Sequence, residues 1–209
     1  MMAWAGSWLA VALLGLAEPE RLERYDFTEK HMGVPVKIVL YAPDEAAANA
    51  AAQAAYARFA QLDKVLSDYD PESELMRLCR RAGTPEPTPV SGDLWKVLRR
   101  SQELARATDG AFDVTVGPLV RLWRRSRREK ELPSPKLLAE ALAATGFESL
   151  VLHEDARAVA LLKPGMRLDL GGIGMGYAVD EAMQVLEHHG IRRALIDASG
   201  DILASAPPP

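Results

Sequence analysis

The feature that most constrains the fold is a long alanine-rich segment from Glu45 to Leu66. Its larger apolar side chains recur at three- and four-residue spacing, which is the periodicity of one helix face: Ala55, Phe59, Leu62 and Leu66. Asp44 stands directly before the segment and is a favourable N-cap residue. The segment therefore predicts one long amphipathic helix that packs its apolar face on a core.

The segments around this helix alternate between strand and helix patterns. Residues 24–42 predict two strands joined by a turn at Gly33 and Pro35. Further along, the patterns predict helices over 73–79, 91–107, 135–145 and 175–189, and strands over 149–152, 158–162, 167–170 and 193–196. Because the spacing is irregular and hairpin-like pairs occur, we predict an α+β (mixed α/β) domain and not a doubly wound parallel sheet.

Charge and cysteine content exclude several function classes. The formal net charge of -4 argues against broad nucleic-acid binding, which requires a basic face. One basic run, residues 121–130, departs from this balance, and we interpret it as a solvated helix end. The single cysteine, Cys79, excludes an intramolecular disulfide, and its apolar neighbours predict a buried thiol. The four histidines show no metal-ligand spacing.

The N-terminal residues 3–17 form an apolar stretch, AWAGSWLAVALLGLA, followed by the charged Glu18. The stretch is too short to span a bilayer as a helix, but it matches the apolar core of a secretory signal. We therefore predict that residues 1–17 are a signal peptide and that the protein is exported, periplasmic or in the cell envelope, peripheral to the inner membrane. No lysine or arginine precedes the stretch, so a plain apolar helix and a cytoplasmic protein are the alternative.

One loop carries side chains suited to ligand binding. Between Thr108 and Leu119 the chain reads TDGAFDVTVGPL, where Gly110 permits a tight turn and Asp113 stands where a helical segment can begin. A carboxylate and free backbone amides at such a turn can bind the polar edge of a heterocycle or a ribose. The alternative is that Asp113 only caps a helix.

A second loop is rich in glycine. Between Asp169 and Asp180 the chain reads DLGGIGMGYAVD, placed between a predicted strand and a predicted helix. Such a run brings backbone amides close to a ligand and directs a helix N-terminus at phosphate. It matches neither the Walker A nor the Rossmann fingerprint, and a plain packing turn is the alternative. Residues 196–202, IDASGDI, form a third polar segment, which predicts a strand end and a turn.

Taken in order, these segments resemble the FAD:protein FMN transferase (ApbE) family. The family pattern has a Met-Gly near the first strand, here Met32-Gly33. It continues with a Ser-x-Tyr-like turn and a Ser-Glu-Leu helix start, here residues 67–69 and 73–75. Its Thr-x-Gly-Ala-Phe-Asp block matches residues 108–113 and continues to Trp123 with hardly a gap, and its Asp-Leu-Gly-Gly-Ile block matches residues 169–180.

The resemblance covers residues 22–206 and implies an ApbE-like flavin transferase fold, a ligand set and an activity. FAD would be bound at the positions that match the family's contacts: Met32, Tyr69, Ala111, Phe112, Asp113, Asp169 and Met175. Mg2+ would be held in part by the main-chain carbonyl of Gly172. The implied reaction depends on magnesium, transfers FMN from FAD to a threonine or serine hydroxyl of a target redox protein, and releases AMP.

Two departures from the family pattern bear on this activity. The family often has lysine at the position of Met175, and a thioether supplies no positive charge there. Relatives also continue past the last residues of this sequence, with side chains that complete magnesium coordination. We therefore expect residues 22–206 to be the N-terminal two-thirds of a flavin transferase domain, C-terminally truncated. The alternative is a non-catalytic or degenerate FAD-binding protein.

Overall fold

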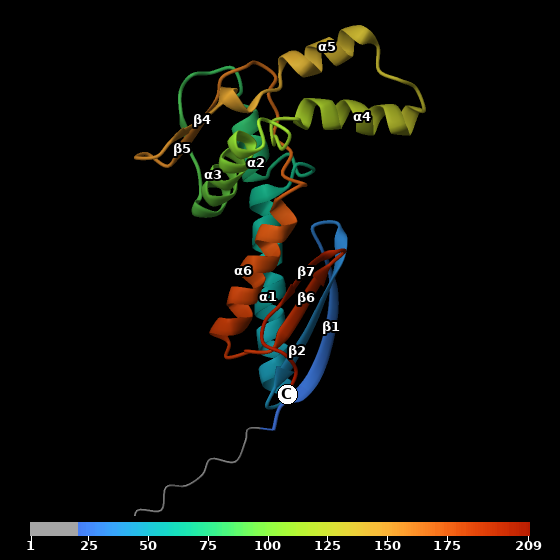
Figure 1. Ribbon diagram of the computed structural model, residues 1–209, viewed down its shortest axis with the longest axis vertical. Helices are drawn as coiled ribbons and strands as arrows, with labels where there is room; N and C mark the ends of the chain where they lie inside the picture. Colours follow the sequence, from blue (N-terminus) through green and yellow to red (C-terminus); the bar gives the residue numbers. More distant parts are fainter. Residues whose placement is uncertain (1–20) are drawn as a thin grey trace, which may run out of the picture.

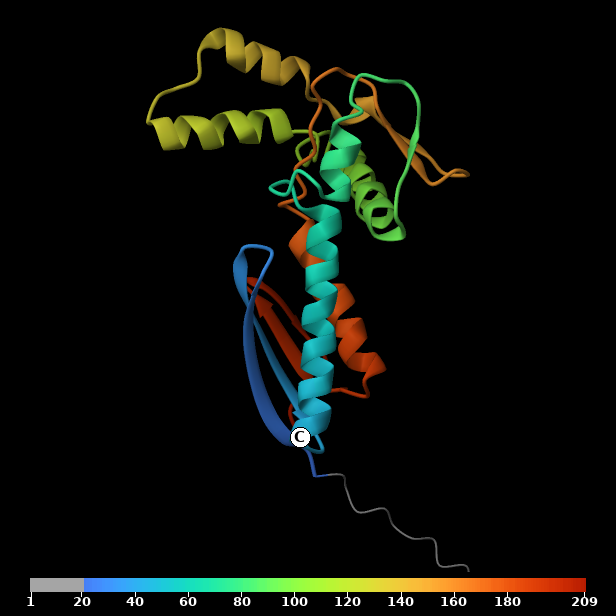
Figure 2. The ribbon, with the colours of Figure 1, turned by 180° about the vertical axis from the view of Figure 1, so that it is seen from behind.

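The computed structural model describes residues 21–209, and the predicted signal peptide at residues 1–17 lies outside them. The described chain is elongated and has two parts (Figure 1). One part is a sheet covered on one face by two helices, and the other is a group of further helices beside a small sheet. The first long helix runs from the sheet into the helical part, as the view from behind shows (Figure 2).

The larger sheet has the strand order β1-β2-β6-β7, and every neighbouring pair is antiparallel. Its strands are β1 (Glu23–His31), β2 (Val34–Ala42), β6 (Ala194–Ala198) and β7 (Asp201–Ala204). The two helices on its covered face are α1 (Glu45–Leu66) and α6 (Gly174–His188). Alternate residues of β2 are fully buried, which places the core between this sheet and the helices: Val36, Ile38, Leu40 and Ala42.

The long helix forms as its periodicity predicts. The carboxylate of Asp44 accepts a hydrogen bond from the amide of Ala47 at 2.8 Å and caps the first turn. Phe59 and Leu62 are fully buried, and α1 packs along α6. At its far end α6 is followed by Gly190, whose φ of 81° lets the chain leave the helix and continue to β6.

The helical part contains the remaining elements. They are α2 (Glu74–Cys79), β3 (Thr88–Pro89), α3 (Gly92–Ala107), α4 (Gly117–Glu129), α5 (Pro135–Ala143), a 3-10 turn (Phe147–Ser149), β4 (Leu150–His153) and β5 (Ala158–Leu161). The small sheet has the order β3-β5-β4 and is antiparallel. The pair α4 and α5 projects from the rest of the chain (Figures 1 and 2). The fold is therefore α+β, as predicted.

The predicted strand over 167–170 is wrong. Within this segment only Arg167 makes a β-bridge, an isolated parallel one to Val116. The next two amides bond to scattered partners: that of Leu168 to the sulfur of Cys79 at 3.3 Å, and that of Asp169 to the carbonyl of Val114 at 2.8 Å. In this segment the buried Leu168 and Leu170 alternate with Arg167 and Asp169, and such alternation alone does not distinguish a strand from a chain that crosses the core without a sheet partner.

Other differences concern short elements. The turn predicted within residues 196–202 forms at Ser199 and Gly200, and two short strands that the sequence patterns do not predict are present, β7 after this turn and β3 at Thr88–Pro89. The basic run belongs to α4, a full helix. Cys79 is buried and free, as predicted, and burial raises the pKa of its thiol. None of the helices within residues 21–209 combines the length and the apolar character that crossing a bilayer requires.

Candidate functional site

The first candidate segment, residues 108–115, is a tight turn after α3. Asp109 and Gly110 both have positive φ, 51° and 78°, and reverse the chain. The hydroxyl of Thr108 accepts a hydrogen bond from the amide of Phe112 at 3.0 Å and closes the turn. The turn therefore presents residues 111–113 together at one end of α3, with Ala111 exposed.

Asp113 lies at the exit of this turn. Its carboxylate accepts a hydrogen bond from the amide of Thr115 at 2.7 Å. The helix that follows begins at Gly117, and its N-cap residue, Val116, provides no side-chain hydrogen bond. Asp113 thus stabilises the turn that precedes α4 and does not occupy the N-cap position of that helix.

The second candidate segment is the turn from Asp169 into α6. The carboxylate of Asp169 accepts a hydrogen bond from the amide of Gly171 at 2.9 Å. Ile173, the N-cap residue of α6, provides no side-chain cap, so the partial positive charge of the helix N-terminus is not offset there. A Cβ on Gly172 would lie 3.2 Å from the ring of Phe112, so glycine lets the two candidate segments lie close together.

Arg124 of α4 connects further candidate residues. Its guanidinium carbon lies 4.5 Å from the centre of the Tyr69 ring, a cation–π distance. The same guanidinium is paired with Asp68 at 2.5 Å and with Asp169 at 3.0 Å. Tyr69 is 76% exposed, so its ring is held on one side and remains open to a flat ligand.

The sequence prediction for Arg124 was incomplete, because the basic run was interpreted as a solvated helix end. Arg121 is three and four residues before Arg124 and Arg125, these are four and three residues before Arg128, and all four line one groove. That spacing was the signal in the sequence. This spacing indicates that the basic residues of the run share one face of a helix.

The structure brings most of the predicted ligand residues together. Tyr69 and Asp169 share Arg124, and the hydrogen bond from the amide of Asp169 to the carbonyl of Val114 joins them to the turn at residues 111–113. The site is thus assembled from four separate stretches of the chain. The loop after α1, the turn after α3, α4 and the start of α6 each contribute.

Met32 and Met175 lie near this assembly but are not tied to it by the contacts above. Met32 is at the tip of the β1–β2 hairpin with a φ of 48°, and Met175 is in the first turn of α6. Both are half-buried against the core. The hairpin tip and the start of α6 lie at the same end of the sheet (Figure 1).

The third polar segment is the turn between β6 and β7. The carboxylate of Asp197 accepts a hydrogen bond from the amide of Gly200 at 3.1 Å, so this side chain stabilises the turn. Asp201 instead lines a hollow of about 500 Å³ together with Gly172 and Lys96. The second and third segments therefore border the same hollow.

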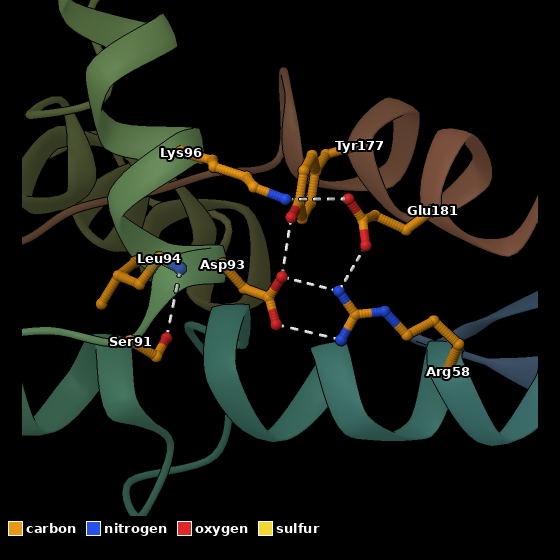
Figure 3. Close-up of polar contacts among 7 residues, drawn as sticks. All are labelled: Arg58, Ser91, Asp93, Leu94, Lys96, Tyr177 and Glu181. Atoms are coloured by element: carbon orange, nitrogen blue, oxygen red, sulfur yellow. Dashed lines mark hydrogen bonds and ion pairs between the residues drawn. The ribbon is translucent and has the colours of Figure 1, made fainter. Parts of the chain in front are cut away.

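A polar cluster fixes the helices behind the site (Figure 3). Arg58 of α1 donates to Asp93 of α3 at 3.0 and 2.6 Å, and to Glu181 of α6 at 2.5 Å. The hydroxyl of Tyr177 donates to the same Asp93 at 2.7 Å. Lys96 lies 3.4 Å from Glu181. One cluster therefore joins three helices.

The charges of this cluster follow from its contacts. Hydrogen bonds from Arg58 hold the pKa of Asp93 below its usual range, although burial opposes the shift. Burial has the largest single effect on Glu181 and would raise its pKa, but the hydrogen bonds and positive charges around it, those of Arg58 first, together outweigh burial, and the pKa is lowered. Burial and then the hydrogen bond to Asp93 raise the pKa of Tyr177. At neutral pH the carboxylates are ionised and the phenol is protonated.

The described residues do not by themselves fit a magnesium centre. Within residues 21–209 no group of three or more His, Cys, Asp or Glu side chains is placed to hold a metal ion. Gly172 offers only its main-chain carbonyl, whereas Mg2+ prefers carboxylates and water. The same residues do fit a ligand with a flat ring and an anionic group, because Tyr69 is exposed and the start of α6 presents free amides.

Solved structures that resemble this chain include a flavin transferase. The chain resembles the flavin transferase ApbE from Vibrio cholerae with a TM-score of 0.83 and 27% identity, over 90% of this chain and 61% of that chain. It resembles the ApbE protein from Thermotoga maritima with a TM-score of 0.79 and 27% identity, over 89% of this chain and 60% of that one. The fold is ApbE-like, as the sequence resemblance implied.

The sequence comparison agrees with the fold. The family model described as ApbE family matches residues 32–209, and the chain belongs to this family. A FAD:protein FMN transferase of Klebsiella pneumoniae (strain 342) is 30% identical over 178 residues, 85% of this chain and 55% of the relative. Another FAD:protein FMN transferase, from Treponema pallidum (strain Nichols), is 31% identical over 190 residues, which are 88% of this chain and 52% of the relative. The chain spans about half the length of these curated relatives.

Proposed function

We propose that this chain acts in the transfer of FMN from FAD to a threonine or serine hydroxyl of a target redox protein. The name of its relatives, FAD:protein FMN transferase, describes transfer of FMN from FAD to a protein, whereas the threonine or serine acceptor and the redox target are what the family resemblance implies. The observation that carries the proposal is the placement of an exposed, Arg124-stacked Tyr69 beside Asp169 and the uncapped start of α6. A flavin nucleotide requires both an aromatic platform and amide donors for its phosphates.

Each proposed contact with FAD follows from where the residue lies in the structure. The ring of Tyr69 stacks on a flat ring of FAD, and the turn at residues 111–113 offers backbone groups and a carboxylate to polar edges. The amides at the start of α6 face the diphosphate. Met32 and Met175, half-buried near the same end of the sheet, supply apolar contacts.

The proposed reaction is a phosphoryl transfer. The acceptor hydroxyl oxygen forms a bond to the phosphorus of the FMN half, the bond from that phosphorus to the bridging oxygen breaks, AMP leaves, and the hydroxyl proton passes to solvent. Magnesium would supply positive charge for the leaving phosphate, and we propose that the carbonyl of Gly172 contributes to its site. No step is assigned to the metal, since the described residues hold no cluster of acidic ligands.

The proposal is tested by incubating the purified chain with FAD, Mg2+ and an acceptor domain that contains a threonine, and by measuring the intact mass of the acceptor. An added FMN mass that is lost in EDTA is the expected result for a magnesium-dependent transferase. An acceptor of unchanged mass would count against transfer by this chain.

A second candidate function is FAD binding without transfer. Two observations favour it: Met175 carries no charge, and residues 21–209 contain no cluster of metal-ligating side chains. The same experiment separates the two functions. FAD that stays bound to the chain while the acceptor mass is unchanged supports binding alone.

We further propose that the protein is exported and works in the periplasm or cell envelope, with the target redox protein in the same compartment. The apolar stretch at residues 3–17 supports this. Fusion of the N-terminal segment to a reporter that is active only outside the cytoplasm tests it. An inactive reporter would place the protein in the cytoplasm.

A further inference from the structure

The proposed function leaves one organised surface unexplained, the groove between α4 and α5. This α4–α5 groove has a volume of about 760 Å³ and begins at Asp68 and Tyr69, beside the proposed flavin site. Five arginines line it: Arg121, Arg124, Arg125, Arg128 and Arg167. Three carboxylates line it as well: Asp68, Glu129 and Glu140. The groove is therefore basic, although the whole chain carries a formal net charge of -4.

The arginines differ in how far their charge is already neutralised. Arg124 is paired with two carboxylates, and Arg125 is paired with Glu129 at 2.9 Å. Arg128 lies 3.9 Å from the same Glu129, which is at the outer limit of an ion pair. Among the described residues, Arg121 and Arg167 have no carboxylate within ion-pair distance. The groove therefore offers positive charge that a ligand can pair with.

The shape of the groove favours an extended ligand. Apolar side chains accompany the arginines: Pro118, Leu122, Leu137 and Ala141. The helix α4 has 13 residues, so its length is about 20 Å at the usual rise per residue. That length matches about six residues of an extended peptide. A small anion would occupy only one end, whereas a peptide with acidic and apolar side chains would cover the lining.

We propose that the α4–α5 groove docks an extended acidic segment of the protein substrate. This inference rests on the proposed transfer of FMN, because a protein acceptor must be held while its hydroxyl reaches the flavin. Tyr69 lines the end of the groove, so a segment bound there lies next to the site. A peptide can also cover the apolar lining at Leu122 and Leu137, which a nucleic-acid backbone does not, and binding of a nucleic acid is one outcome of the test.

The experiment uses a fluorescein-labelled peptide in which glutamate alternates with alanine, and a matched peptide with glutamine in place of glutamate. Binding to the 209-residue chain is measured by fluorescence anisotropy without FAD. The variant is Arg121→Ser with Arg128→Ser. The control is Arg127→Ser with Arg192→Ser, which removes the same amount of positive charge. Arg127 is on α4 but lines a different hollow, beside Trp123, and Arg192 is exposed outside the groove.

We expect the glutamate peptide to bind and the glutamine peptide not to. The groove variant should weaken binding about tenfold, and the control should leave it unchanged. Four outcomes would each overturn the proposal. They are equal affinity of the two variants for the glutamate peptide, equal affinity of the chain for the two peptides, no measurable binding, and tighter binding of a labelled oligo-dT. Retention of FAD is measured separately by flavin fluorescence, so a failure of the proposed function is distinguished from a failure of the groove.

Discussion

The hydroxyl of Tyr177 donates a hydrogen bond of 2.7 Å to the carboxylate of Asp93, and this bond ties the start of α6 to the start of α3. The same carboxylate accepts two hydrogen bonds from Arg58 of α1. The turn at residues 108–115 follows α3, and the glycine-rich turn precedes α6. The Asp93 carboxylate therefore holds in place the helices that carry both candidate segments.

Replacement of Asp93 by asparagine tests this role. The amide cannot accept charge-assisted bonds from Arg58 and Tyr177 together, and Arg58 loses half of its ionic partners. We expect the free energy of unfolding, measured by chemical denaturation, to fall by about 1–3 kcal/mol. The matched control is Glu103→Gln on the same helix, where the carboxylate is paired only at the surface. An equal loss in both variants would contradict the prediction.

The same cluster predicts how stability depends on pH. The pKa values of Asp93 and Glu181 are lowered in the folded chain, so the unfolded chain binds more protons when the medium becomes acidic. Their contribution is fully present above the unfolded pKa values of about 4 and is lost as pH falls through the folded values. The variant Asp93→Asn with Glu181→Gln should therefore show a flatter fall of Tm on the acid side. Parallel Tm curves of the variant and the parent would rule this out.

Arg124 predicts an effect on ligand binding. Replacement by alanine removes the guanidinium behind the Tyr69 ring and leaves Asp68 and Asp169 without their shared partner. We expect FAD affinity, measured by flavin fluorescence titration, to weaken about five- to thirtyfold, which corresponds to about 1–2 kcal/mol. Arg127→Ala on the same helix should leave affinity unchanged. If Arg124→Ala binds FAD like the parent chain, Tyr69 is not the ring platform.

The sequence predicted the long elements and failed where structure depends on distant partners. The helix at residues 45–66 followed from its own periodicity and cap. The strand predicted over residues 167–170 does not form: buried leucines alternate there with charged residues, as in a strand, but the segment makes only one isolated bridge. The spacing of the arginines indicates one basic face, but the pairing of Arg124 with Asp68 is not predictable from it, because the two residues are 56 positions apart and no local pattern shows that contact. The assignment of ligands to Tyr69 and Asp169 stays a prediction from the family motifs.

Gly117, the first residue of α4, predicts a steric coupling between α4 and the glycine-rich turn. A Cβ at this position would lie 2.6 Å from the carbonyl oxygen of Arg167 and 2.7 Å from its carbonyl carbon. These are backbone atoms, so they cannot move aside as a flexible side chain would. We expect Gly117→Ala to lower the free energy of unfolding by about 1–3 kcal/mol. Because Asp169 is two residues further along, displacement of Arg167 should also weaken FAD binding.

The control for this prediction is Gly176→Ala in α6, where an added Cβ meets nothing within 4 Å. Alanine is the better helix former, so we expect this variant to be unchanged or more stable by up to about 1 kcal/mol. Chemical denaturation of both variants, with flavin fluorescence titration of the Gly117 variant, checks the pair. A Gly117→Ala chain as stable as the parent would mean that Arg167 can shift freely. The close packing of α4 against that segment would then not be what positions Asp169.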